Sequence, residues 1–410
     1  MSHQQRKTSW LRRLIWLAGL TLAGLVLLVL FLWLNPFGWR DRILARMGVI
    51  FNPPVVVTPP PGFVPQVPPG FKVSVFADGF EQPRWLATAP DGDIFVADSQ
   101  SGKIIVLQDP NHRGRTEARF AFAEDLHQPF GITFHDSYVY VGDTDEVLRF
   151  RYDPKTSRPL GGREHILDLP GGGYNQHWTR TLAFSPDSAK LFVSVGSKSN
   201  VSIESDARRA AILETDPDGK NSRIYATGLR NAVGIAFNPA SGQLWASVNE
   251  RDLLGDDQPA DYLTHVVEGG FYGWPYSYLG GHVDTRVSPR PDLVAKAIVP
   301  DMLLGAHVAP LEFIFYEARQ FPSSYLHGAF ITEHGSWNRR TRSGYQVVFV
   351  PFKDGKPAGD PTPFFTGFVP NPNAKEVYGR LVGVTVAADG SLLISDDGGR
   401  LIWRVQYNGG

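Results

Sequence analysis

A sixfold repeat constrains the fold of this 410-residue chain more than any other feature. Each copy contains a polar or cationic residue, an apolar strand, a turn that is often written PDG, and a second apolar strand. Equivalent places, at intervals of 46, 50, 53, 78 and 71 residues, are held by Leu86, Ile132, Leu182, Ile235, Phe313 and Val384. Self-similarity near this period, with several strands in each copy, is the signature of a β-propeller. We therefore predict an all-β fold, a six-bladed β-propeller over residues 71–410.

The two ends of the repeat region carry further strand-like segments, FKVSVFA at 71–77 and LIWRVQY at 401–407. Pairing them in one blade closes the ring, because an open ring would leave unpaired strand edges. The two long intervals imply insertions at about 250–306 and 335–378, and insertions in repeat proteins usually project from one face. A sandwich of two all-β domains is the competing architecture.

The segment before the repeats is predicted to lie outside the propeller. Residues 14–34 are an uncharged apolar run, and as a helix they are long enough to cross a hydrocarbon core of about 30 Å. Residues 1–13 are then cytoplasmic, although basic residues flank the run on both sides and orient it only weakly. The run lacks an A-x-A-like cleavage site, which favours an uncleaved signal anchor over a removed signal peptide.

A proline-rich linker is predicted over residues 35–70. Its second half, 53–70, carries eight prolines and is typical of an extended polyproline II spacer. A proline-rich recognition ligand is the alternative interpretation. With the membrane helix as anchor, we expect a single-pass protein of the cytoplasmic membrane whose catalytic domain lies on the periplasmic, extracytoplasmic side.

Charge and cysteine content exclude several function classes. The chain has 40 basic and 41 acidic residues, so electrostatics give no support for a nucleic-acid partner. It has no cysteine, which excludes disulfides, thiolate metal sites, a cysteine nucleophile and covalently attached c-type haem.

Basic and imidazole side chains recur just before the innermost strand of each predicted blade. Innermost strands run along the central channel, so these positions meet at one mouth. They are Arg84, His127 or Gln128, His177 with Arg180, Arg230 with Asn231, His307, and Arg380. Polar residues are common at strand ends, which is the simpler explanation of each position alone. Their recurrence favours a compact polyanion as ligand, because arginine forks pair with carboxylates. A histidine among these cations can stay neutral and accept a proton.

Seven motifs together resemble the glucose/sorbosone dehydrogenase family, and the resemblance covers about 71–407. They are HWTRTLAFSPD, GLRNAVGIAFNP, NERDLLGDDQPADYL, GGFYGWP, HVAPL, EHGSWNR and YGRLVGV. Members are soluble quinoproteins with six-bladed propellers that bind pyrroloquinoline quinone (PQQ) and calcium (Ca2+). The resemblance implies oxidation of a small sugar or sugar-derived aldehyde by hydride transfer, with electrons passed to an external quinone or cytochrome. It is closer to the sorbosone dehydrogenase branch.

The same resemblance assigns roles to individual residues. His177 is implied as the catalytic general base, with Asp257 placed to orient it. Calcium would be held by the backbone carbonyls of about Asp252 and Leu253. The family's quinone-pairing lysine has no clear counterpart, and Arg339 or Arg340 is the candidate replacement. Contacts with the cofactor are implied for Arg230, Asn231, His307, Arg339 and Arg380.

Two other function classes remain open. A calcium-dependent lactonase is also commonly a six-bladed propeller, but it needs carboxylate and asparagine ligands where this chain mostly has arginine and histidine. A non-catalytic, membrane-tethered binding propeller would keep the blades and lose the base.

Overall fold

A computed structural model describes residues 16–30, 51–111, 113–171 and 177–409, and the chain divides into two compact units, Met1–Asn52 and Pro53–Gly410. In the first unit, residues 16–30 form a helix with exposed side chains. Within the described ranges, no helix combines the length and the apolar character that a membrane crossing needs. The span predicted over 14–34 is therefore not supported; its ends, 14–15 and 31–34, lie outside the described residues. The extracytoplasmic location stays a prediction.

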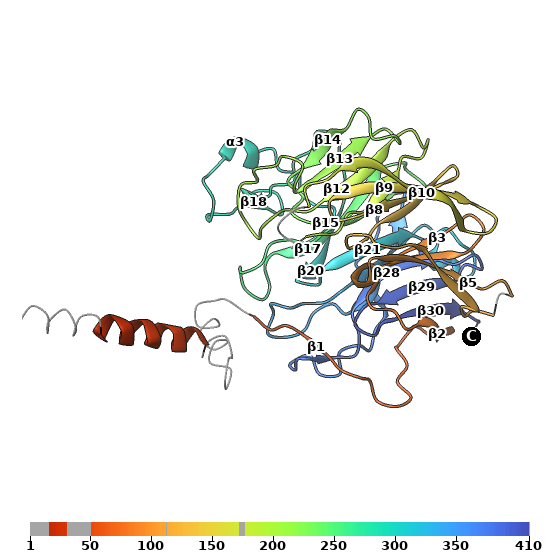
Figure 1. The fold of residues 1–410 in the computed structure, drawn as a ribbon, viewed down its shortest axis with the longest axis horizontal. Helices are drawn as coiled ribbons and strands as arrows, with labels where there is room; N and C mark the ends of the chain where they lie inside the picture. Colours follow the sequence, from red (N-terminus) through yellow and green to blue (C-terminus); the bar gives the residue numbers. More distant parts are fainter. Residues whose placement is uncertain (1–15, 31–50, 112, 172–176, 410) are drawn as a thin grey trace, which may run out of the picture. The chain divides into compact units, whose positions relative to one another are not determined.

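Six four-stranded antiparallel sheets make up the second unit and confirm the predicted six-bladed propeller (Figure 1). Each of the six equivalent apolar residues lies in the first strand of its own blade. The first three blades are β3 (Pro83–Thr88), β4 (Ile94–Asp98), β5 (Lys103–Gln108) and β6 (Ala118–Ala123); β7 (Ile132–His135), β8 (Tyr138–Gly142), β9 (Glu146–Asp153) and β10 (Arg158–Asp168); and β11 (Leu182–Phe184), β12 (Leu191–Val195), β13 (Ala211–Thr215) and β14 (Arg223–Thr227).

The remaining blades include the one that closes the ring. They are β15 (Ala232–Phe237), β16 (Leu244–Val248), β17 (Ala260–His265) and β20 (Met302–Ala306); β21 (Pro310–Phe315), β22 (Ala329–Glu333), β23 (Gln346–Val350) and β26 (Thr362–Phe365); and β28 (Leu381–Val386), β29 (Leu392–Asp396), β30 (Leu401–Tyr407) and β2 (Phe71–Asp78). In the sixth blade β2 pairs with β30, from Phe71 opposite Tyr407 to Asp78 opposite Leu401. The predicted closure is confirmed.

Short elements occupy the loops between strands. The stretch between β17 and β20 holds β18 (Ser277–Tyr278), β19 (His282–Val283) and α3 (Pro291–Val294). The stretch between β23 and β26 holds β24 (Phe352–Lys353) and β25 (Lys356–Pro357), and two 3-10 turns are η2 (Ser99–Ser101) and η3 (Ser323–Tyr325). Both predicted insertions are therefore present, the first within the fourth blade and the second within the fifth.

Residues 53–70 belong to the propeller unit, which corrects the predicted stalk and its boundary at 71. Strand β1 (Val55–Val56) pairs in parallel with β27 (Glu376–Val377). The Phe63 ring makes an edge contact with Tyr378, at 5.0 Å between centroids. Proline composition predicted a spacer, but the valines between the prolines still donate backbone N–H groups to a neighbouring strand.

Neighbouring blades approach each other through backbone at the central channel. A glycine directly precedes the equivalent apolar residue in three blades, and at Gly234 an added Cβ would lie 2.4 Å from the carbonyl oxygen of Leu311. The Ser247 hydroxyl donates to that same carbonyl at 2.5 Å. At Gly383 the Cβ would lie 2.3 Å from the Arg84 carbonyl oxygen. Only glycine fits these positions, so the repeats lock together at the ends of the innermost strands.

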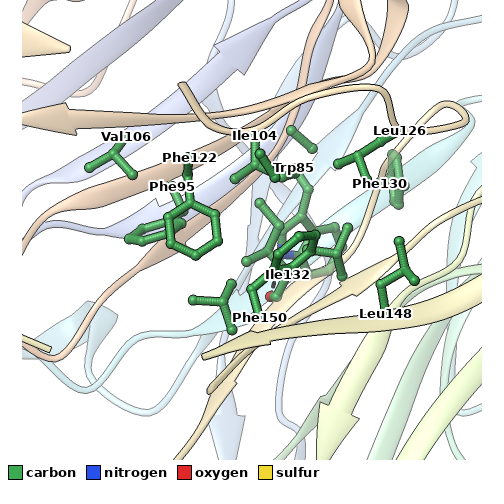
Figure 2. Packing of buried hydrophobic residues seen from close by; sticks show 14 of the residues in the cluster. Trp85, Phe95, Ile104, Val106, Phe122, Leu126, Phe130, Ile132, Leu148 and Phe150 are labelled. Atoms are coloured by element: carbon green, nitrogen blue, oxygen red, sulfur yellow. Dashed lines mark hydrogen bonds between the residues drawn. The ribbon is translucent and has the colours of Figure 1, made fainter. Parts of the chain in front are cut away.

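Apolar packing fills the space between blades, as Figure 2 shows for the first two. Phe95 and Phe130 are fully buried there, and the Trp85 indole N–H donates to the Ile132 carbonyl at 3.2 Å. Burying a side chain of this size contributes about 1.5–3 kcal/mol. The loops at the blade ends are thus carried on a rigid frame.

Candidate active site

A cavity of about 410 Å³ lies where loops from the third to sixth blades converge. Its volume falls within the range of about 300–1,000 Å³ that is typical of small-molecule sites. The prediction that residues preceding the innermost strands meet at one mouth is confirmed for four blades. The sequence-predicted residues in its lining are His177, Arg230, Asn231, His307 and Arg380, together with Asp252.

A carboxylate at the end of the second strand fixes several of these loops. In the sixth blade, Asp396 accepts a hydrogen bond from the backbone N–H of Arg380 at 2.7 Å. The same bond joins Asp143 to the His127 N–H at 2.6 Å in the second blade. The third blade has Gly196 and Ser197 after its second strand instead, and there the histidine side chain forms the link.

His177 is held in a strained backbone conformation with a defined tautomer. Its φ is +54°, which non-glycine residues rarely adopt. Nδ1 lies 2.9 Å from the Ser197 carbonyl oxygen, so Nδ1 carries the proton and Nε2 keeps its lone pair. A Cβ on Gly196 would lie 2.6 Å from the His177 Cβ, so the glycine is required for this approach. Burial, followed by the charge of Arg230, lowers the His177 pKa well below its ordinary value.

Asp257 does not orient His177, and that prediction is wrong. The Asp257 side chain is 81% exposed and accepts a hydrogen bond from Arg339 Nη2 at 2.8 Å. Ser197 orients the imidazole instead. Neither Asp257 nor Arg339 belongs to the cavity lining, so the predicted cofactor contact of Arg339 is not supported. The loop that carries Arg339 folds onto Asp256 and Asp257, through Arg340 N–H to Asp256 Oδ1 at 2.9 Å.

Arg230 is 2% exposed, and the protein itself engages all of its N–H groups. Nε and Nη2 donate to Asn200, at 3.1 Å each, and Nη1 donates to the carbonyls of Glu250 and Asn249. Nη2 also pairs with Asp252 Oδ2 at 2.9 Å. Arg230 therefore fixes the surrounding loops and contributes positive charge, rather than donating directly to a ligand as predicted.

Arg380 retains donor capacity toward the cavity. Its Nε donates to the His334 carbonyl at 3.3 Å, and its Nη2 donates to the Gly335 carbonyl at 3.1 Å. Neither bond uses Nη1, so this group is available to a ligand with carboxylate or carbonyl oxygens. Of the predicted arginines, Arg380 is the one whose geometry suits direct anion binding.

His334 and Asp397 form a pair that sequence reasoning missed. His334 lines the cavity, and its Nε2 lies 3.0 Å from Asp397 Oδ1. Asp397 Oδ2 accepts from Arg84 Nη1 at 2.5 Å. Burial, then Arg380, lowers the His334 pKa to about 4. Burial opposes ionisation of Asp397, but His334 and Arg84 outweigh it and lower its pKa.

Both residues of this pair follow second strands rather than preceding first ones. His334 belongs to EHGSWNR, after β22, and Asp397 follows β29 in the next blade. The repeat pattern drew attention only to residues just before the first strand of each blade. The signal was present in EHG and SDD, but pairing them requires that adjacent blades place these loops side by side.

Other side chains give the cavity aromatic surface and hold its loops. Trp178 and Trp337 both contribute to the lining. The Arg84 guanidinium lies 5.4 Å from the Trp178 ring centroid, a cation-π distance. His307, with φ of +60°, places Nε2 2.8 Å from the Gly255 carbonyl, so Nε2 donates there. A planar aromatic ligand can stack on such indole faces.

The calcium ligands implied by the resemblance do not fit this structure. The Asp252 carbonyl accepts hydrogen bonds from Asn200 Nδ2 at 3.0 Å and from Arg286 Nη1 at 3.1 Å. The Asp252 carboxylate accepts from Arg230 and from Asn338. Calcium takes six to eight oxygen ligands, and these oxygens are already committed to N–H donors. Over the described part of the chain, no group of three His, Asp or Glu side chains could hold a metal. These bonds do not support Asp252 as a metal ligand, and the assignment of Leu253 stays a prediction.

Comparison with known proteins identifies the class to which this cavity belongs. A family model described as TrAA12-like matches residues 65–267 and 293–408, and the chain belongs to this family of propellers. An uncharacterized protein of Borreliella burgdorferi is 30% identical over 83% of this chain and 90% of its own length. The PQQ-dependent pyranose dehydrogenase of Coprinopsis cinerea is 25% identical over 83% of this chain. That match covers 54% of the fungal enzyme, so the chain spans about half its length.

Solved structures share the fold. The holo form of the PQQ domain of the Coprinopsis cinerea pyranose dehydrogenase superposes with a TM-score of 0.69 and 22% identity, over 86% of this chain and 99% of that one. The calcium structure of the Trichoderma reesei family AA12 enzyme gives a TM-score of 0.70 and 22% identity, over 84% and 97%. At these identities the likeness shows the propeller alone.

Proposed function

We propose that this protein oxidises a small sugar, or a sugar-derived aldehyde, with PQQ as cofactor and passes the electrons to an external acceptor. The observation that carries the proposal is one cavity that joins Arg380, the charge of Arg230 and a neutral, oriented His177. Relatives named as PQQ-dependent sugar dehydrogenases at about 25% identity support it. The sorbosone-type substrate stays a prediction.

The donor set of the cavity fits a planar polycarboxylate. Arg380 Nη1 can meet a carboxylate, and the buried Arg230 adds a second positive charge close by. The tryptophans at 178 and 337 offer faces for an aromatic ring system. The Asn231 side chain also faces this lining, and its Oδ1 has no hydrogen-bond partner among the described residues. These residues would hold PQQ.

The chemistry needs a hydride acceptor and a base, and PQQ supplies the acceptor when it is bound. His177 Nε2 would take the proton of the substrate hydroxyl, because Nδ1 is already committed to Ser197. Burial and then the Arg230 charge keep the His177 pKa low. An anionic ligand offsets that charge and raises the pKa, so binding prepares His177 to act as a base.

Titration of the apo-protein with PQQ tests the proposal. Tryptophan fluorescence should be quenched on binding, and dye-linked sugar oxidation should appear only with PQQ present. Arg380→Gln should weaken PQQ binding by about tenfold or more, since a charge-assisted bond is lost. Arg290→Gln, which removes an exposed arginine paired with Asp292, is the matched control and should bind PQQ normally.

The same titration separates the alternatives. A folded protein that neither binds PQQ nor oxidises any sugar contradicts the proposal. Metal-dependent hydrolysis of lactones without PQQ would favour the lactonase. Sugar binding without turnover at saturating PQQ would favour a non-catalytic propeller.

A further inference from the structure

A guanidinium from the segment between β17 and β20 contacts the loop after β16, at the place where the family resemblance implies calcium. We propose that this chain binds its quinone cofactor without a calcium ion there, because the Arg286 guanidinium already donates a hydrogen bond to the Asp252 carbonyl. Asp252 lines the cavity, so this substitution acts on the proposed cofactor site. The inference rests on the proposed function and concerns what that site requires.

Arg286 is fixed by three hydrogen bonds from its guanidinium. Nε donates to Asp284 Oδ1 at 2.9 Å, and Nη2 donates to Asp284 Oδ2 at 2.7 Å. This two-point fork orients Nη1 toward the Asp252 carbonyl at 3.1 Å. Bidentate pairs of this kind define both the distance and the plane of the guanidinium. Arg286 therefore does not reach Asp252 as a loose surface side chain.

Asp284 is itself held in place. Its side chain is 1% exposed and also accepts from Arg251 Nη1 at 2.9 Å. Burial opposes its ionisation, but Arg286 and Arg251 outweigh burial and lower its pKa to about 2. Arg251 is fully buried, bonds to the Pro275 and Ser277 carbonyls, and lies 5.3 Å from the Tyr278 ring centroid. The guanidinium of Arg286 thus stands on a buried ionic network.

The Asp252 carbonyl has no remaining capacity for a metal. A carbonyl oxygen has two lone pairs, and this one accepts from both Asn200 Nδ2 and Arg286 Nη1. A calcium ion would have to displace one donor and would then lie beside the positive charge of Arg286. Like charges at such close range repel, so the arrangement opposes the ion on both counts.

The two residues that create this arrangement lie outside the residues that the family model matches. The family model matches 65–267 and resumes at 293, so Asp284 and Arg286 fall in the unmatched segment 268–292. That segment contains the β18–β19 hairpin, where the Tyr278 and His282 rings stack at 5.4 Å. A segment that the family model does not match therefore delivers the guanidinium to a loop within the matched residues.

Metal dependence of cofactor binding tests the inference in the full chain. We would treat purified apo-protein with EDTA and measure PQQ binding by tryptophan fluorescence, in EDTA and in excess CaCl2. Wild type should bind PQQ with the same Kd in both, within about twofold. Arg286→Ala removes the guanidinium from the Asp252 carbonyl and from Asp284, so its PQQ binding should become about tenfold tighter in calcium than in EDTA.

Two controls make the outcome decisive. Arg290→Ala removes an equal charge from the same insertion and should behave as wild type. Arg286→Met, which keeps the side-chain length without a charge or an N–H donor, serves if the alanine variant does not fold. A wild type that needs calcium to bind PQQ overturns the inference, as does an Arg286 variant indifferent to calcium.

Failure of the proposed function would give a different result. If no variant binds PQQ under either condition, the cofactor assignment is wrong. Calorimetric titration of the apo-protein with CaCl2 alone then decides the inference. Calcium binding by wild type overturns it, whereas binding by Arg286→Ala alone supports it.

Discussion

The cavity presents two neutral histidines that are held in opposite ways. On the third blade, His177 Nδ1 bonds to the Ser197 carbonyl, and the nearby charges are arginines. On the fifth blade, His334 Nε2 bonds to the Asp397 carboxylate. Burial and nearby arginines oppose protonation of both rings, but the group that favours protonation is a neutral carbonyl for His177 and the Asp397 carboxylate for His334. The two imidazoles therefore respond differently to a bound anion.

A bound anion would offset Arg230 beside His177 and Arg380 beside His334, but of the two imidazoles only His334 already has a carboxylate partner. Burial and then the Arg230 charge lower the His177 pKa, and a bound anion would offset the part that Arg230 contributes. His334 already has a counter-ion of its own. We infer that His177 is the base that ligand binding activates and that His334 is a positioning residue.

Exchange of each histidine for alanine gives the largest expected difference between the His177 side and the His334 side of the cavity. His177→Ala should lower turnover by about 10²–10⁴, the usual contribution of a positioned base, with PQQ binding retained. His334→Ala should lower turnover by about tenfold or less. Dye-linked sugar oxidation at saturating PQQ measures both. The roles would have to be exchanged if His334→Ala proved the more damaging change while binding PQQ normally.

Removal of the Asp397 charge tests how much its buried ion pair with Arg84 contributes to the free energy of unfolding. Asp397→Asn leaves Arg84 buried without its carboxylate partner, and breaking a buried pair costs about 3–5 kcal/mol. Urea denaturation measures the change in the free energy of unfolding. Asp257→Asn breaks the exposed pair with Arg339 and is the matched control, with an expected cost below about 1 kcal/mol. Equal costs would mean that the buried Asp397 pair stabilises the protein no more than the exposed Asp257 pair does.

Sequence repetition was sufficient to predict the fold. Strand alternation is local, and a closed ring converts equivalent sequence positions into spatial neighbours. Leu86 and Val384, at opposite ends of the repeat array, accordingly occupy the same place in their blades. The convergence of His177, Arg230 and Arg380 on one cavity follows from the same symmetry.

The contacts within the site could not be predicted in this way. Ser197 took the role expected of Asp257, and the Asp252 carbonyl that was expected to bind calcium accepts a hydrogen bond from Arg286. Both outcomes depend on loop conformations and on donors from distant segments, which residue spacing does not determine. The proline-rich segment failed for a related reason, because composition described its backbone preference but not its pairing with β27.

Nitrogen-15 NMR of the two imidazoles measures the smallest expected difference. It does so directly, because it changes nothing in the protein. We expect Nδ1–H on His177 and Nε2–H on His334, the reverse of one another. His334, with its pKa at about 4, should remain neutral at pH 6. His177→Gln and His334→Gln assign the two sets of signals.

The pH dependence of folding follows from the same lowered pKa values. An unfolded histidine takes up a proton near pH 6.5, whereas folded His334 resists it down to about 4. The stability that neutral His334 contributes should therefore be fully present above pH 6.5 and be lost as the pH falls from 6.5 toward 4. His334→Gln should flatten this loss in urea denaturation at pH 5 relative to pH 7.5. Addition of PQQ should then shift the His177 nitrogens more than those of His334, because the Asp397 carboxylate already pairs with the His334 ring. Equal shifts at both rings would remove the distinction between an activated base and a fixed positioning residue.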